Sequence, residues 1–181
     1  MSGNGDLASR LLAKVRDVPD FPKPGIVFKD ITPMLADHGC FTAAVAGLVD
    51  PRRGTDIDIV AGIEARGFIL GAPVALALDA GFAPVRKQGK LPGATVAATY
   101  ELEYGSATLE VTSDAFAPGS RVLVVDDVLA TGGTAAATVD LVRRSGAEVV
   151  GVSFLLELGS LGGRAALRAV GIDDPHVLLT V

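Results

Sequence analysis

Two neighbouring carboxylates followed by a Gly- and Thr-rich stretch are the residues of this chain best suited to chemistry. The segment Arg121-Val-Leu-Val-Val-Asp-Asp-Val-Leu-Ala-Thr-Gly-Gly-Thr134 places Asp126 and Asp127 directly after a run of four apolar residues. Carboxylates accept hydrogen bonds from vicinal hydroxyl groups, or bind Mg²⁺ directly or through water. Backbone N–H groups at a glycine-rich helix start bind anions. A sugar phosphate needs both kinds of group, and few other ligands do.

The elements around this segment are expected to place it at one edge of a sheet. Residues 122–125 are consecutive apolar residues, mostly β-branched, as in a parallel strand buried on both faces. Residues 135–145 have the pattern of a helix, and Gly146 suits its end. The stretch 131–134 is therefore expected where the strand, ended by the two aspartates, turns into the helix.

Each part of this segment also has an ordinary explanation. Two aspartates after a strand often form only a turn and a helix cap, and paired glycines often mark only a loop. The segment is not a Walker loop, because no Lys follows the glycines, and it lacks the G-x-G-x-x-G dinucleotide pattern. The combination is far more specific than its parts.

The rest of the chain alternates between strand and helix patterns. We expect helices at 6–18, 38–49, 68–80 (distorted by Pro73), 135–145 and near 161–169, and strands at 56–63, 82–86, 121–126, 148–156 and 176–181. Residues 95–111 are expected to form an antiparallel hairpin, and Pro84 indicates an incompletely paired strand position. This alternation predicts an α/β fold with a mostly parallel central sheet flanked by helices.

Composition narrows the class of protein. At 181 residues and 49% hydrophobic content, the chain fits one folded domain. Its net charge of −5 disfavours a nonspecific binder of nucleic acid or anionic membranes. Cys40 is the single cysteine and is expected to be buried, and His38 and His176 are too far apart in sequence to suggest a metal site. The polar N-terminus and the lack of a long apolar stretch predict a cytoplasmic protein.

Four motifs, in order, carry a family resemblance. Val124-Val-Asp-Asp-Val-Leu-Ala-Thr-Gly-Gly-Thr134 is similar to the phosphoribosyl pyrophosphate motif of type I phosphoribosyltransferases. Three further segments resemble the adenine-using branch of that family: Phe21-Pro-Lys-Pro-Gly-Ile-Val-Phe-Lys-Asp-Ile-Thr-Pro33, Glu64-Ala-Arg-Gly-Phe68, and Arg86-Lys-Gln-Gly-Lys-Leu-Pro-Gly93 followed by Leu102-Glu-Tyr-Gly105. The resemblance covers about residues 20–160.

The resemblance implies an activity and a domain plan. The activity is transfer of the phosphoribosyl group from phosphoribosyl pyrophosphate to adenine, giving AMP and pyrophosphate. Mg²⁺ is the implied cofactor, carried mainly by the substrate near Asp126 and Asp127, with no direct protein ligand assigned. One domain spanning 1–181 is implied, with an N-terminal hood at about 1–35 that contributes the purine site and a mobile lid at about 87–111. Members of the family are commonly homodimers.

The resemblance also implies which residues bind phosphoribosyl pyrophosphate. Asp126 and Asp127 would hold the ribose hydroxyls. The 5′-phosphate would lie against five residues: Ala130, Thr131, Gly132, Gly133 and Thr134. The pyrophosphate would be bound by Ala65, Arg66, Arg86, Lys87 and Lys90, with a cis peptide bond before Ala65 and with Arg86 acting across a dimer interface. The ordinary alternatives are a pair between Arg66 and Glu64 and a solvated basic cluster at 86–90.

The purine would be recognised by a short extended segment. Adenine needs one C=O and one N–H from the backbone, which the resemblance places at Val27 and Lys29, while Phe28 and Val128 would pack on the two purine faces. The family often has Arg at position 29, so the role of the Lys29 side chain stays open. Phe28 could equally be core filler.

Glu103 resembles the carboxylate that handles purine protonation in this family. Glu101 lies two residues earlier and would share its face in an extended strand, so either could act, although the motif position favours Glu103. A solvent-facing hairpin edge is the ordinary alternative. Two other functions stay open: a transferase for hypoxanthine, guanine or xanthine, and a regulator that senses phosphoribosyl pyrophosphate without catalysis.

Overall fold

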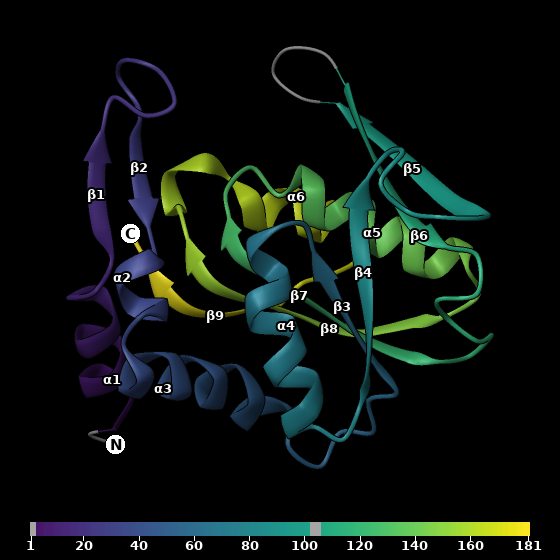
Figure 1. The fold of residues 1–181 in the computed structure, drawn as a ribbon, viewed down its shortest axis with the longest axis horizontal. Helices are drawn as coiled ribbons and strands as arrows, with labels where there is room; N and C mark the ends of the chain where they lie inside the picture. Colours follow the sequence, from purple (N-terminus) through teal and green to yellow (C-terminus); the bar gives the residue numbers. More distant parts are fainter. Residues whose placement is uncertain (1–2, 102–105) are drawn as a thin grey trace. The chain divides into compact units, whose positions relative to one another are not determined.

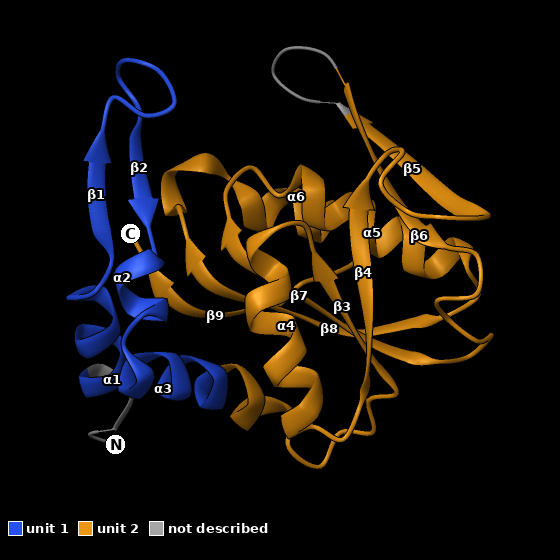
Figure 2. Ribbon diagram, in the orientation of Figure 1, with its two compact units in different colours: residues 1–47 blue, residues 48–181 orange. Residues whose placement is uncertain are grey.

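The computed structural model describes residues 3–101 and 106–181 (Figure 1). The chain divides into two compact units, residues 1–47 and residues 48–181 (Figure 2). The expectation that the whole chain is a single domain stays a prediction. None of the helices in the described ranges has both the length and the apolar character needed to cross a bilayer.

The unit of residues 1–47 is built around a small hairpin. Its elements are α1 (Gly3–Leu12), β1 (Arg16–Pro19), β2 (Val27–Asp30), α2 (Thr32–Leu35) and most of α3 (His38–Val49). Strand β1 pairs antiparallel with β2, with Asp17 opposite Lys29. The expected helix over 6–18 is therefore wrong in its second half. Ion pairs from Asp17 to Lys29 and from Arg16 to Asp30 stabilise residues 16–19 as a strand instead.

The unit of residues 48–181 contains a seven-stranded sheet in the order β5-β6-β4-β3-β7-β8-β9 (Figure 1). The strands are β3 (Ile59–Ile63), β4 (Gly81–Lys87), β5 (Thr95–Glu101), β6 (Ser106–Thr112), β7 (Arg121–Leu129), β8 (Glu148–Glu157) and β9 (His176–Thr180). The pairings from β4 through β3, β7 and β8 to β9 are parallel, and β6 pairs antiparallel with β4 and β5. The predicted mostly parallel sheet is confirmed.

Helices cover both faces of this sheet. The helices are α4 (Arg66–Ala77), α5 (Gly133–Arg144) and α6 (Gly163–Ala169), with 3₁₀ turns η1 (Asp50–Arg52) and η2 (Gly159–Leu161). Helix α4 packs on the face that carries Val60 and Gly62. Ala61 and Ile63 point to the other face, where they join the hydrophobic core with residues of α5 and α6. The sheet is therefore buried on both sides, as its apolar strands predict.

Strand β7, which carries the central acid pair, is longer than the sequence pattern predicts. Strand β7 does not end at the aspartates but continues to Leu129, because Val128 and Leu129 pair with β8. Helix α5 begins at Gly133, two residues before its expected start. At Pro84 the expectation is confirmed: β4 pairs with β3 there, whereas β6 pairs with β4 only at Arg86 and Lys87.

Candidate active site

The two central carboxylates lie in β7 beside the first turn of α4. Asp126 Oδ1 accepts a hydrogen bond from the backbone N–H of Asp127 at 2.8 Å, and Asp127 Oδ2 accepts one from Arg66 Nε. A Cβ atom at Gly67 would lie 2.7 Å from Asp126 Oδ1, so only glycine lets α4 approach this closely. Burial, and then the Asp127 charge, raise the pKa of Asp126 well above its ordinary value. The oxygens of the two neighbouring carboxyl groups can accept hydrogen bonds from hydroxyl groups.

The loop after β7 leads directly into the N-terminus of α5. Gly132 occupies the N-cap position with φ +84° and has no side chain, so it caps none of the first amides of α5. These amides and the helix dipole favour an anion. Thr131 is exposed, and the Thr134 hydroxyl lies 3.0 Å from the hydroxyl of Tyr100 on β5. The predicted phosphate loop therefore has the geometry of an anion site.

This loop rests on the start of α6. A Cβ atom at Gly132 would lie 2.6 Å from the backbone O of Gly163 and 2.9 Å from the Cβ of Ala166. Two glycine backbones thus meet where no side chain would fit. The position of the phosphate loop is fixed by α6 as well as by β7.

A buried carboxylate contacts all three basic residues of the basic segment, residues 86–90: two through their cationic groups and one through its backbone. Glu64, whose side chain is 9% exposed, accepts hydrogen bonds from Arg86 Nε at 3.2 Å, from the backbone N–H of Lys87 at 3.0 Å and from Lys90 Nζ. Burial raises the pKa of Glu64, but its bonds to Lys90, Lys87 and Arg86 outweigh that effect, and the pKa is lowered. Glu110, also buried, accepts a bond from Gly89 N–H at 3.0 Å. The basic segment is therefore anchored at both ends.

Arg66 and the basic segment meet around the turn at residues 64 and 65. The peptide bond Glu64–Ala65 is cis, as the resemblance implies. Ala65 is exposed and Arg66 opens α4. The ion pair that the structure gives Arg66 is with Asp127 rather than with Glu64, so that ordinary alternative does not hold. Residues 64–66 thus connect the acid pair to the basic segment.

The predicted purine residues lie mainly in the unit of residues 1–47. Val27 is exposed at the start of β2, and the ring of Phe28 is half-buried, 5.3 Å from the ring of Phe21 in an edge-to-face arrangement. Lys29 Nζ lies 2.7 Å from Asp17, which gives its side chain a role inside the hairpin. Val128, in the other unit, is half-buried in β7.

Glu103 lies outside the described residues, as does the side chain of Glu101. The sequence interpretation overlooked Glu64, Glu110 and Tyr100 as parts of the site. Only Glu64 carried a signal, because it stands two residues before Arg66 in the same motif. Within the described ranges, no group of three or more His, Cys, Asp or Glu side chains is arranged to hold a metal ion.

Comparison with known proteins agrees with this geometry. A family model for the phosphoribosyl transferase domain matches residues 33–165. The adenine phosphoribosyltransferase of Nocardioides sp. is 61% identical over 177 residues, which cover 96% of this chain and 94% of the relative. The crystal structure of the Rhodothermus marinus adenine phosphoribosyltransferase matches with a TM-score of 0.91 and 50% identity, covering 98% of this chain and 99% of that one.

The Saccharomyces cerevisiae enzyme extends the comparison to a liganded structure. That adenine phosphoribosyltransferase, complexed with an imino-altritol bisphosphate and adenine, matches at 40% identity and a TM-score of 0.86, covering 96% of this chain and 97% of that one. The chain therefore belongs to the phosphoribosyltransferase family and, within it, to the adenine phosphoribosyltransferases.

Proposed function

We infer that this chain transfers the phosphoribosyl group from phosphoribosyl pyrophosphate to adenine, giving AMP and pyrophosphate in purine salvage. The observation that carries this inference is the 61% identity to an adenine phosphoribosyltransferase across 96% of the chain. The acid pair within β7, and the uncapped helix start that follows this strand, supply the chemistry that such a substrate requires. The protein is accordingly a glycosyltransferase.

The acid pair and the phosphate loop hold the phosphoribosyl group. Asp126 and Asp127 bind the vicinal ribose hydroxyls, which is supported by their adjacency in β7. Residues 130–134 receive the 5′-phosphate on backbone amides and on the Thr131 and Thr134 hydroxyls. The two contacts fix both ends of the sugar, and this orients C1 for reaction.

Cations around the turn at residues 64–66 bind the leaving pyrophosphate. Arg66, Lys87 and Lys90, together with the exposed backbone at Ala65, stabilise the charge that develops as the C1–O bond breaks ahead of attack by N9. The pairs of Arg66 with Asp127 and of Lys90 with Glu64 hold these cations near one another before substrate arrives. Arg86 is proposed to reach pyrophosphate across a dimer interface.

The hairpin of the first unit supplies the adenine site. A backbone C=O and an N–H at Val27 and Lys29 complement the N6 donor and N1 acceptor of adenine, and Phe28 and Val128 pack on the purine faces. An oxopurine would leave these backbone groups unpaired, which penalises its binding. Because the Lys29 side chain is engaged by Asp17, its contribution to the purine is through the backbone.

Glu103 is proposed to handle purine protonation at N7. It lies in the segment of about residues 87–111 that is proposed to close over the substrate. Closure excludes water and strengthens the electrostatic effect of a carboxylate near the base. Glu101 remains an alternative for the same role.

Mg²⁺ is the proposed cofactor, and the donor set fits it. Mg²⁺ prefers oxygen ligands and is usually held by one or two carboxylates together with substrate phosphates. Asp126 and Asp127 are such carboxylates, next to the place proposed for the diphosphate. Bound there, the ion would help to neutralise charge on the departing pyrophosphate.

A homodimer is proposed on the basis of exposed apolar side chains on α4. Ile69 and Leu76 lie seven residues apart on one helix face and are 44% and 79% exposed. Apolar side chains grouped in this way are typical of an interface between copies. A cytoplasmic site of action is also proposed, since the polyanionic substrate does not cross a bilayer unaided.

The activity is tested by measuring AMP formation by the purified protein with Mg²⁺ and four purine bases. Adenine should be strongly preferred over hypoxanthine, guanine and xanthine. Tight binding of phosphoribosyl pyrophosphate without any turnover would point to a sensor instead.

The residue roles are tested by two sets of variants. Replacing both Asp126 and Asp127 by Asn should weaken phosphoribosyl pyrophosphate binding severely, whereas Asp114→Asn, at an exposed position, should not. Normal affinity in the double variant means that the acid pair is only a turn. Glu103→Ala should lower kcat more than it raises KM, and an unchanged kcat removes Glu103 from the mechanism.

A further inference from the structure

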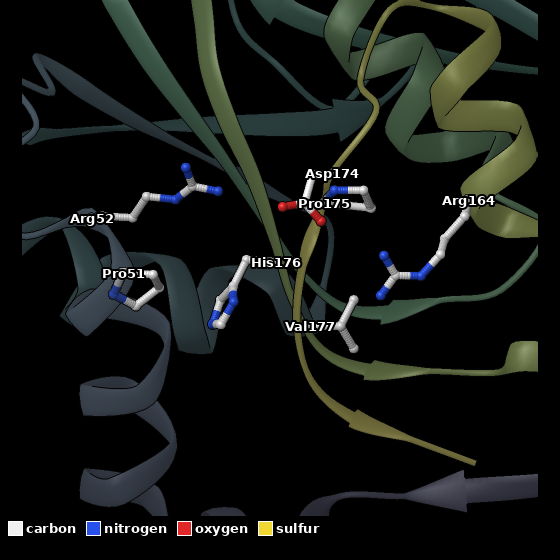
Figure 3. Close-up of a pocket in the computed structure, with 7 residues that line it drawn as sticks. All are labelled: Pro51, Arg52, Arg164, Asp174, Pro175, His176 and Val177. Atoms are coloured by element: carbon white, nitrogen blue, oxygen red, sulfur yellow. The ribbon is translucent and has the colours of Figure 1, made fainter. Parts of the chain in front are cut away.

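A polar pocket in the unit of residues 48–181 shares no lining residue with the candidate active site. Its volume is about 400 Å³, within the usual range for small-ligand sites. Its lining consists of Pro51, Arg52, Arg164, Asp174, Pro175, His176 and Val177. Figure 3 shows Arg52 and Arg164 approaching the start of β9 from two sides, with Asp174 between them.

Arg52 is a partly buried cation with an unsatisfied hydrogen-bond donor. Its Nε is buried and has no hydrogen-bond partner among the described residues. Burial lowers the pKa of Arg52, and the charge of the nearby Asp174 carboxylate offsets this only in part. Its guanidinium lies flat against β8 at Gly151, where a Cβ atom would come within 2.5 Å of its Cζ. A glycine in mid-strand thus makes room for this group. Buried polar groups without partners are rare, so a partner from outside the chain is indicated.

A second unpaired polar atom lies on the same face of β8. The Oγ of Ser153 is buried and without a partner among the described residues. Ser153 stands two residues after Gly151, so the two residues share one side of the strand. The polar character of this region is therefore not confined to Arg52.

Arg164 and Asp174 complete the chemistry of the pocket. Arg164 Nε lies 2.9 Å and 3.0 Å from the two carboxylate oxygens of Glu157, which orients its guanidinium. Arg164 lines the pocket, and Glu157 engages its Nε, so the proposal assigns its terminal nitrogens to a ligand. Asp174 adds a carboxylate that accepts hydrogen bonds from hydroxyl groups.

We propose that this pocket binds a small phosphorylated polyol. The phosphate lies between the guanidinium groups of Arg52 and Arg164, whose planar forks match phosphate oxygens in pairs. The hydroxyl groups donate to Asp174. Inorganic phosphate would contact only Arg52 and Arg164 and not Asp174. A phosphorylated polyol and inorganic phosphate can therefore be distinguished.

The two histidines of the chain give a site-specific measurement. His176 lines the pocket and His38 does not, so their imidazole NMR signals serve as reporter and internal control. At constant pH and ionic strength, ribose 5-phosphate should shift the His176 signal saturably and leave that of His38 unchanged. No saturable shift of His176 with either ribose 5-phosphate or inorganic phosphate overturns the site.

Substitutions of Arg52 test whether its guanidinium binds the phosphate. Arg52→Gln should weaken binding by about tenfold or more, as loss of a charge-assisted hydrogen bond implies, and Arg52→Lys should weaken it less. Arg168→Gln removes an exposed charge from α6 outside the lining and should bind like the parent. Parental affinity in both Arg52 variants overturns the proposal.

Asp174→Asn separates a polyol from bare phosphate. Removal of this negative charge should tighten binding of inorganic phosphate and weaken that of ribose 5-phosphate relative to it. If both ligands respond equally, the assignment of hydroxyl groups to Asp174 is wrong.

Discussion

The contact between Gly132 and α6 makes Gly132→Ala the most informative substitution. Residue 132 has φ +84°, and a non-glycine residue in this region costs about 1–2 kcal/mol. The new Cβ would also meet the Gly163 oxygen at 2.6 Å and the Ala166 Cβ at 2.9 Å. Such overpacking costs a further ~1–3 kcal/mol, so we expect a total loss of stability of about 2–5 kcal/mol.

A second glycine offers a matched control. Gly119 has φ +80° but no atom within 4 Å of its built Cβ, so Gly119→Ala should lose only the backbone part. Urea denaturation followed by circular dichroism measures both variants against the parent. The difference between them isolates the crowding between the phosphate loop and α6.

Kinetics provide the second readout for Gly132→Ala. The loop must move away from α6 to admit the methyl group, so the KM for phosphoribosyl pyrophosphate should rise while that of Gly119→Ala stays near the parental value. Equal losses of stability in the two variants would falsify the crowding argument. An unchanged KM in a destabilised Gly132→Ala would separate the loop from substrate binding.

Three further predictions concern neighbouring groups. Tyr100→Phe removes the hydroxyl contact with Thr134 and should cost about 0.5–1.5 kcal/mol in urea denaturation; no loss would show that the contact is unimportant. Glu64→Gln should raise the KM for phosphoribosyl pyrophosphate with little change in kcat, because the basic segment loses its anchor, whereas the exposed Glu148→Gln should change neither. Because the folded-state pKa of Asp126 is raised, its carboxyl reduces stability as pH rises above 3.8 toward that pKa. Asp126→Asn should therefore be more stable than the parent at pH 7 and gain nothing at pH 3, and an equal gain at both would contradict the burial argument.

Local patterns predicted the approximate positions of the strands in the central sheet and its mostly parallel character, but not the ends of its elements. The β-branched run at 122–125 identified β7 correctly. Its extension to Leu129 depends on pairing with β8, a non-local contact that a local pattern does not contain. Strand β1 was missed because Arg16–Pro19 has no apolar alternation, and ion pairs to β2 hold it in place.

The motifs singled out charged residues that lie together in the structure, but not how those residues pair. They singled out Arg66, Asp126 and Asp127, which the structure brings together. The sequence could not predict that Arg66 pairs with Asp127 and not with Glu64. In the structure Glu64 is already paired with Lys90 of the basic segment. A sequence gives the charges of such a cluster, whereas the fold decides how they pair.

The hydroxyl contact between Tyr100 and Thr134 makes the intrinsic fluorescence of Tyr100 a reporter of the phosphate loop. The protein contains no tryptophan and two tyrosines, so a Tyr104→Phe variant keeps Tyr100 as its single tyrosine emitter. That emitter touches the threonine at the start of α5 through a phenolic oxygen 3.0 Å away. Fluorescence of a phenol depends on its hydrogen-bonding partner, and nucleotide arrival at the loop can therefore be followed in unlabelled protein on the stopped-flow timescale.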